Sequence, residues 1–177
     1  FAYNDLNALE ALLQELVGKT ACIIMEPTSR IHPQDGYLQG VRDLADKYKV
    51  VLIFDEVVTG FRFHRGGYQS ICGVTPDLAC FSKAMGKGVP IAALVGKRDI
   101  MENCTDIFFS LTFAGETLSL AASKAIMEFV DKKNVPKVIE ENGQYFVDEM
   151  NNQIRKYGLE NVVEVDGYPC RSVMVFR

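Results

Sequence analysis

Apolar and polar positions recur with two different periods along the chain, and the change of period predicts alternating helices and strands. In LNALEALLQELV the leucines recur at helical spacing behind the N-cap candidates Asn4 and Asp5, and we expect Gly18 to end that helix. Further helices are predicted at residues 37–49, 98–103, 116–134 and 136–158.

Between these helices lie short runs that are apolar throughout, which is typical of strands buried on both faces. The predicted strands cover residues 21–27, 50–54, 77–82 and 91–96, with two more β segments at residues 162–165 and 172–176. The alternation of such strands with amphipathic helices predicts an α/β fold, a mostly parallel sheet with helices on both faces. In sheets of this kind, ligands bind beyond the carboxyl ends of the strands.

The composition of the 177 residues argues against several classes of protein. Apolar residues make up 48% and charged residues 24%, which is enough for a packed core, and the formal net charge is -4 with both signs mixed. We expect no nucleic-acid surface, which would show a basic stripe, and no membrane span, because no apolar run is long enough. The first residues carry Asp and Glu where an export signal would carry basic side chains.

Cysteine and histidine usage points to an intracellular protein without a metal site. The five cysteines are scattered and form no C-x-x-C pair, which is typical of reduced thiols, and we expect a cytoplasmic protein. His32 and His64 lie far apart in the sequence, so no spacing predicts metal ligands.

One predicted strand ends in a way that requires a partner for its charge. The run VVLIF at residues 50–54 leads directly into Asp55 and Glu56, and burial of a carboxylate is costly unless a group of opposite charge accompanies it. A P-loop nucleotide hydrolase would place a magnesium-binding acid here, but it also needs a glycine-rich phosphate loop upstream. The sequence offers GKT at residues 18–20, yet Leu13 occupies the position of the first glycine and lies in a predicted helix. This alternative is not favoured.

A lysine follows another predicted strand in the same manner. Lys83 comes directly after DLACFS and before a glycine-containing loop, where an unpaired ammonium would be costly to bury. A lysine that forms a Schiff base with pyridoxal phosphate avoids that cost, and the pyridine nitrogen then needs a carboxylate, for which Asp55 is the candidate. Val57 would cover one face of the ring. From spacing alone the alternative stays open that Lys83 and Lys87 are solvated loop lysines and Asp55 a surface acid.

Four blocks of the sequence resemble the class III pyridoxal-phosphate aminotransferases, and most nearly their glutamate-1-semialdehyde aminomutase-like branch. The blocks are IIMEP, LIFDEVVTGFR, GVTPDLACFSKAMGKGVPIAALVGKRDIM and SLTFAGETLSLAASKAI, in family order over nearly the whole chain. The resemblance implies a fold-type I transferase, with residues 1–160 as a portion of the cofactor-binding large domain and residues 161–177 as the start of the small C-terminal domain. It also implies pyridoxal 5'-phosphate as the cofactor and a homodimer with the active site at the subunit interface.

Matched position by position, the resemblance implies roles for four residues. Lys83 corresponds to the Schiff-base lysine, and Asp55 to the acid on the pyridine nitrogen. Val57 corresponds to the residue packed on the ring. Thr112 corresponds to a threonine that, in such dimers, reaches the cofactor phosphate of the other subunit.

Other positions match the family less closely. Glu26 and Glu56 correspond to family acids near the site, for which we expect supporting roles. Lys87 interrupts a run of glycines that the family has after the lysine, and Glu116 stands where the family has asparagine. The family's phosphate loop and the aromatic ring stacked on its cofactor precede the matched region, so we expect the chain by itself to be inactive.

The implied function is transfer of an amino group between a small-molecule amino donor and a carbonyl acceptor, or an intramolecular transfer on an amino-aldehyde. The alternative is a non-catalytic module that serves as a dimerisation or interaction core, motivated by the missing phosphate loop. The sequence predicts no particular substrate.

Overall fold

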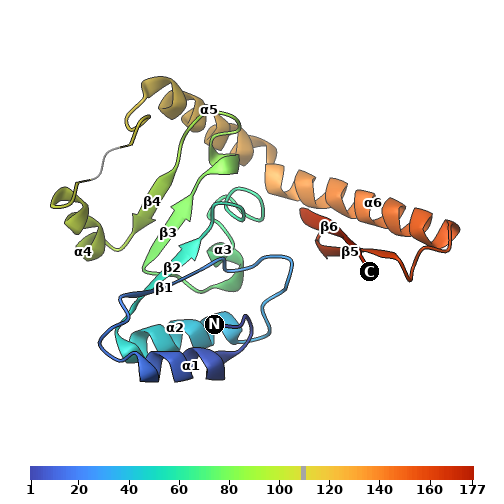
Figure 1. Ribbon diagram of the computed structural model, residues 1–177. Coiled ribbons are helices and arrows are strands. Elements are labelled where there is room, and N and C mark those ends of the chain that lie inside the picture. The colour runs from blue at the N-terminus through green and yellow to red at the C-terminus, as the bar shows by residue number, and fades with distance from the viewer. Residues whose placement is uncertain (109–110) are drawn as a thin grey trace.

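The computed structural model describes residues 1–108 and 111–177, and its central element is a four-stranded sheet (Figure 1). The strand order is β1-β2-β3-β4, in which β1, β2 and β3 are parallel and β4 is antiparallel to β3. Strands β5 and β6 form a separate antiparallel hairpin. The elements are α1 Leu6–Glu15, β1 Cys22–Met25, α2 Tyr37–Tyr48, β2 Val51–Asp55, α3 Gln69–Cys72, β3 Leu78–Phe81, η1 Lys83–Met85, β4 Ala93–Gly96, α4 Arg98–Met101, η2 Glu102–Thr105, α5 Thr117–Lys133, α6 Val135–Lys156, β5 Val163–Tyr168 and β6 Arg171–Phe176.

The main core lies between the sheet and the helix pair α1 and α2, which run side by side below it in Figure 1. In the parallel register of β1 and β2, Ile23 pairs with Leu52, and both side chains are buried on the face that these helices cover. Ile24 points to the opposite face, where it is 61% exposed. The other core side chains of this layer are Leu9, Leu13, Tyr37, Leu38, Val41, Ala45, Val50, Phe54, Tyr68 and Val74.

The C-terminal part is a long helix with the hairpin against it. Helix α6 extends away from the sheet, and β5 and β6 lie directly beneath it (Figure 1). The approach is close at Gly143, where a Cβ atom would lie only 2.0 Å from the carbonyl oxygen of Pro169. Only glycine fits there, because any side chain would push the helix away from the hairpin turn.

Most of the predicted elements are confirmed. The side chain of Asp5 caps α1 by accepting a hydrogen bond from the amide of Ala8 at 2.8 Å, as the N-cap pattern predicts. The sheet is mostly parallel, as predicted. The sequence pattern did not predict α3 or η1, and the predicted helix at residues 98–103 is observed as the short α4 followed by η2.

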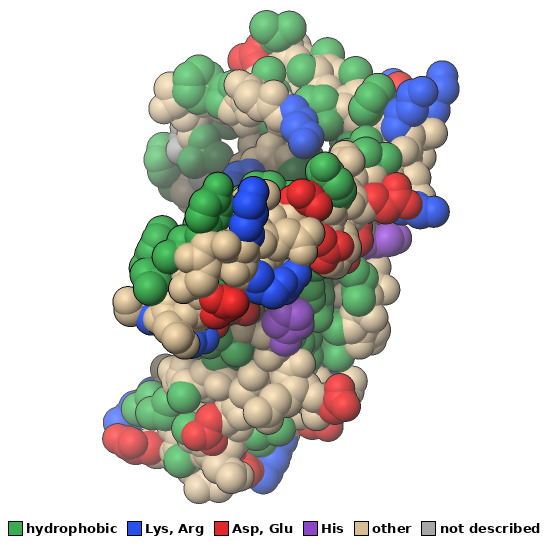
Figure 2. All heavy atoms as spheres, turned by 90° about the vertical axis from the view of Figure 1, so that its right-hand side faces the viewer, with side chains coloured by type: hydrophobic (Ala, Val, Ile, Leu, Met, Phe, Trp, Pro, Cys, Tyr) green, Lys and Arg blue, Asp and Glu red, His purple; other side chains and the backbone are tan. Residues whose placement is uncertain are grey.

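The outer surface on the side of α6 carries acidic and basic side chains intermixed (Figure 2). Among the helices formed by the described residues, none combines the length and apolar character that crossing a bilayer requires.

Candidate active site

The predicted site lies at the carboxyl ends of β2 and β3, which meet at one edge of the sheet because these strands are parallel. Asp55 is the last residue of β2 and pairs in register with Cys80 of β3. Burial, and secondly the charge of Asp55, raise the pKa of the Cys80 thiol. One carboxylate oxygen of Asp55, Oδ1, accepts a hydrogen bond from the amide of Val57 at 3.0 Å. In the described part of the chain, Asp55 has no ion-pair partner.

Val57 lies beyond the strand. Because β2 ends at Asp55 and the chain then turns, the alternation of strand side chains does not extend to Val57. Strand alternation therefore cannot be the reason for Val57 to face the same side as Asp55. The hydrogen bond between its amide and Asp55 nevertheless fixes Val57 beside the acid. Its contact with a cofactor ring stays a prediction.

Glu56, the second acid of the pair, is fully buried and has its charge matched by hydrogen-bond donors. Its Oε2 accepts from the hydroxyl of Thr59 and from the amide of Tyr68 at 2.8 Å, and its Oε1 accepts from the amide of Gln69 at 2.9 Å. The carboxylate thereby ties the end of β2 to the far end of the following loop, residues 57–68. Its role in the structure is to hold that loop in place.

Lys83 begins η1, immediately after the carboxyl end of β3. Its side chain is exposed, and its backbone has φ +41°, in the left-handed region that non-glycine residues seldom occupy. The same region is adopted by Lys87, at φ +46°, and both its amide and that of Gly86 donate to the carbonyl of Lys83 at 3.0 Å. Strained backbone of this kind is concentrated at functional sites, which supports a functional role for Lys83.

Thr112 lies in the turn that precedes α5, on the wall of a pocket of about 500 Å³. Ser82, the neighbour of Lys83, lines the same pocket, whereas Lys83 and Asp55 do not. The structure therefore brings Thr112 near the strand ends but does not place it against the lysine. Glu116 caps α5 by accepting from the amides of Leu118 at 2.7 Å and Ser119 at 2.6 Å. The hydrogen bonds from Ser119 lower the pKa of Glu116.

A further acid, Glu26, is part of a polar clamp between the end of β1 and the hairpin turn. Arg171 Nη1 donates to Glu26 at 2.7 Å and to the carbonyl of Thr28 at 3.1 Å. The Thr28 and Tyr168 hydroxyls are 2.9 Å apart, and Arg62 donates to the carbonyl oxygen of the residue before Arg171 at 2.7 Å. Glu26 is thus engaged by the protein, which agrees with a supporting role.

This clamp could not be predicted from the sequence, because its partners are separated by more than 100 positions. The burial of Glu56 did have a weak signal, the Thr59 three positions later, which is a common spacing for a side chain that bonds back to an acid.

Two residues at the sheet edge could bind two groups of pyridoxal 5'-phosphate, its ring nitrogen and its aldehyde. Asp55 has a carboxylate oxygen, Oδ2, without a hydrogen-bond donor in the described residues, which suits a protonated ring nitrogen. Lys83 offers an exposed amine, without an ion pair to any described residue, for an aldehyde. The hydroxyl of Thr112 lines a neighbouring pocket, and its contact with the cofactor phosphate of the other subunit stays a prediction. The carboxylate and the amine therefore fit the ring nitrogen and the aldehyde of the group. Asp55 ends β2, and Lys83 follows the end of the adjacent strand β3 by two residues.

Comparison with known proteins gives one family. The family model for aminotransferase class-III matches residues 3–168. A glutamate-1-semialdehyde 2,1-aminomutase from Syntrophobacter fumaroxidans is 39% identical over 85% of this chain and 36% of the relative. A 3-aminobutyryl-CoA aminotransferase from Cloacimonas acidaminovorans is 36% identical over the whole of this chain and 44% of the relative. The chain thus spans less than half the length of these curated relatives.

Solved structures show the same fold. The ornithine delta-aminotransferase of Plasmodium falciparum matches the whole chain and 47% of its own length, with a TM-score of 0.86 and 28% identity. The FumI protein of Sphingopyxis sp. MTA144, solved in a form containing PLP, matches with a TM-score of 0.93, and at 22% identity it shows the fold alone. The predicted fold class is confirmed.

Proposed function

Because this chain belongs to the class-III aminotransferase family, we propose that the protein transfers amino groups with pyridoxal 5'-phosphate as its cofactor. The observation that supports this most directly is the arrangement at the sheet edge. An acid without an ion-pair partner, Asp55, ends one strand, and a strained, exposed lysine, Lys83, follows the neighbouring strand. The curated relatives include an aminomutase and an aminotransferase, and the proposal covers both modes of transfer.

Each residue of the site has a defined task in this proposal. When bound, pyridoxal 5'-phosphate supplies a protonated ring that stabilises negative charge on the substrate carbon. Asp55 would accept a hydrogen bond from the ring nitrogen and keep that nitrogen protonated. The amine of Lys83 would hold the cofactor covalently and, once displaced by an amino substrate, take up the proton from the substrate carbon and return it. Val57 would pack on the ring, and the hydroxyl of Thr112 would donate to the phosphate of the cofactor bound by the other subunit.

We also propose that a second copy of the chain completes the site. The support is the apolar surface around Thr112, where Phe108 is 96% exposed and Leu118 is 72% exposed. Exposed apolar surface of this extent is typical of protein interfaces. The same segment also includes the exposed side chains of Ile107, Leu111, Phe113 and Leu120.

The substrates are proposed to be a small-molecule amino donor and a carbonyl acceptor. A cytoplasmic location is proposed on the strength of the five cysteines, which form no disulfide in the described residues.

The test uses the full-length protein, pyridoxal 5'-phosphate and borohydride, which reduces an imine to a stable amine. Peptide mapping by mass spectrometry is expected to find the adduct on Lys83, and trypsin is expected not to cleave after that residue. The variant Lys83→Ala should lose the adduct, whereas Lys87→Ala, the matched control four positions away, should keep it. An adduct on Lys87 alone would refute the assignment of Lys83, and no adduct at all would favour the non-catalytic module.

A further inference from the structure

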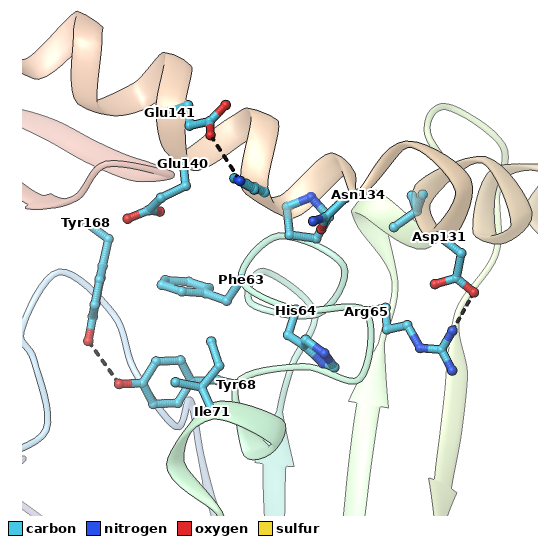
Figure 3. A pocket seen from close by; sticks show the side chains of 13 residues that line it. Phe63, His64, Arg65, Tyr68, Ile71, Asp131, Asn134, Glu140, Glu141 and Tyr168 are labelled. Carbon is cyan, nitrogen blue, oxygen red and sulfur yellow. Dashed lines mark hydrogen bonds and ion pairs between the residues drawn. The ribbon is translucent and has the colours of Figure 1, made fainter.

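A second pocket lies between the loop that follows β2, the junction of α5 with α6, and the β5–β6 hairpin (Figure 3). Its volume is about 610 Å³, within the range of small-molecule sites. Neither Asp55 nor Lys83 lines it, and it shares no lining residue with the pocket at Thr112, so it is separate from the candidate active site.

One side of this pocket is an aromatic wall made by Phe63, Tyr68 and Tyr168. The ring of Phe63 stands almost perpendicular to both tyrosine rings, with centroids 5.3 Å from Tyr68 and 4.8 Å from Tyr168. The two tyrosine hydroxyls lie 3.1 Å apart and hydrogen-bond each other, and His32 stacks on the far side of Tyr168 at 3.8 Å. The rings are therefore held in place before any ligand arrives, which reduces the entropy lost on binding.

The charges around the rim leave an excess of one acid. Arg65 pairs with Asp131 at 2.5 Å, and Lys137 pairs with Glu141 at 3.7 Å. Glu140 also lines the pocket, and in the described part of the chain it has no ion pair. Figure 3 shows its carboxylate on the same side as Tyr168, above the ring of Phe63.

The carboxylate of Glu140 lies within hydrogen-bonding reach of a buried thiol in the hairpin turn. Cys170, which is buried in the hairpin turn, has its pKa raised to about 11 by burial first and then by the charge of Glu140.

We propose that this pocket binds a small organic cation, an ammonium group carried on an apolar body. The ammonium would lie between the carboxylate of Glu140 and the face of Phe63, because an aromatic face and a carboxylate both attract positive charge. The apolar body would contact Ile71 and Val130, which line the same pocket. An anionic ligand does not fit, because both rim cations already have partners and the remaining charge is negative. The proposal is independent of amino transfer.

The test measures binding of benzyltrimethylammonium to the full-length protein by isothermal titration calorimetry. This probe carries no N–H, so it cannot form an imine with a lysine or a cofactor, and any binding is separate from the active-site chemistry. We expect saturable binding at one site. The variant Glu140→Gln should weaken it by about 10-fold, since a lost charge contact of this kind is worth roughly 1.4 kcal/mol.

The matched control is Glu141→Gln, which removes the same charge one position along α6 from a residue paired with Lys137. It should change the dissociation constant less than about 2-fold, as expected for an exposed ion pair. Both residues are exposed, so both variants should keep the melting temperature of the parent. Absence of saturable binding, or equal weakening by the two variants, would overturn the proposal.

Discussion

Two aspartates at opposite ends of neighbouring strands differ in how their charge is compensated. Asp77, just before β3, is buried and has both carboxylate oxygens engaged: Oδ2 accepts from the amide of Leu52 at 2.7 Å and from Arg42 at 2.9 Å, and Oδ1 pairs with Lys97 at 2.6 Å. Asp55, at the end of β2, is half-buried and accepts one hydrogen bond, from the next-but-one amide.

The number of donors to each carboxylate distinguishes acids with a structural role, such as Asp77, from Asp55, which is available to a ligand. The charge of Asp77 is fully compensated within the chain, and removing it should affect folding. Glu56, adjacent to Asp55 in sequence, also has its charge compensated, by three donors. In the acid pair that follows the apolar run, only Asp55 therefore has unused hydrogen-bonding capacity. Substitutions at these three positions should separate activity from stability.

The largest effect is expected for Asp55→Ala. Turnover of the full-length protein should fall by roughly 10²- to 10³-fold, because an electrostatic contact made to the reacting system is lost. Its melting temperature should stay close to that of the parent, since little else in the chain depends on this carboxylate. Steady-state kinetics and calorimetry on the same preparation measure both. Full activity in this variant would remove Asp55 from the mechanism.

Asp77→Asn should show the converse, with folding impaired. The substitution removes the buried one of the two charge partners of Arg42 and leaves only the exposed Asp46, and breaking a buried pair costs about 3 kcal/mol. Urea denaturation measures the loss in free energy of unfolding. The control is Asp46→Asn, which removes the exposed partner of the same arginine and should cost no more than ~0.5 kcal/mol. Equal costs for the two variants would contradict the assignment of Asp77 as a buried structural acid.

Glu56→Gln should destabilise the protein by about 2 kcal/mol, since the amide group would face a backbone N–H and leave that buried donor without an acceptor. Denaturant unfolding is the measurement, with Glu15→Gln on the exposed side of α1 as the control. An unchanged free energy of unfolding would show that the loop after β2 does not depend on this carboxylate.

A third region for comparison is the segment around Thr112. Its apolar side chains, such as Phe108 and Leu118, are largely exposed and have few partners among the described residues. Phe108→Asp should raise the dissociation constant of the proposed dimer about 10-fold, equivalent to roughly 1.4 kcal/mol. Val17→Asp, which places the same charge at an exposed apolar position after α1, should leave it unchanged. Sedimentation velocity over a concentration series measures both. A monomeric parent protein would refute the proposed dimer.

The smallest expected effect is the change in the free energy of unfolding at acidic pH. Burial acts to raise the pKa of Asp77, but the hydrogen bonds from Lys97, the amide of Leu52 and Arg42 outweigh it and leave the pKa below its ordinary value of 3.8. The pKa of Asp77 is lower in the folded state than in the unfolded state. This carboxylate therefore stabilises the fold at pH values above 3.8, and its contribution is lost as the pH falls through the folded-state pKa. The gap in free energy of unfolding between the parent and Asp77→Asn should therefore narrow below pH ~4. A gap that is constant with pH would contradict this.

The sequence predicted the longer helices because their apolar period repeats often enough to count, and it predicted the strands from short runs of consecutive apolar residues. The expected burial of these strands on both faces was wrong for β4, which has no buried residue, and for Ile24 of β1, which is 61% exposed. It also predicted that Asp55 and Lys83 would lie at one edge of the sheet, since parallel strands bring their carboxyl ends together. It could not predict that Asp55 and Glu56 would differ so completely. That difference depends on amides more than ten positions away, those of Tyr68 and Gln69, which a turn brings back to the strand end.

The contacts of the β5–β6 hairpin were even harder to predict from the sequence. Arg171 and Tyr168 occur in a short turn sequence without periodicity, and their partners Glu26 and Thr28 are 145 and 140 positions away. The second pocket, in which Tyr168 forms one wall, depends on the same long-range packing. Local patterns predict elements, whereas sites built between distant elements require coordinates.

The long separation between the two sides of the hairpin clamp has a consequence for biosynthesis. A ribosome adds about 5–20 residues per second, so roughly 6 to 23 seconds pass between translation of Asp55 and translation of Arg171. During that interval the ends of β1 and β2 can form, but Glu26 has no arginine to pair with and Thr28 has no tyrosine hydroxyl. The ends of β1 and β2 therefore lack their hairpin contacts while the chain is still bound to the ribosome. Chaperones that act during translation would encounter the chain in that state.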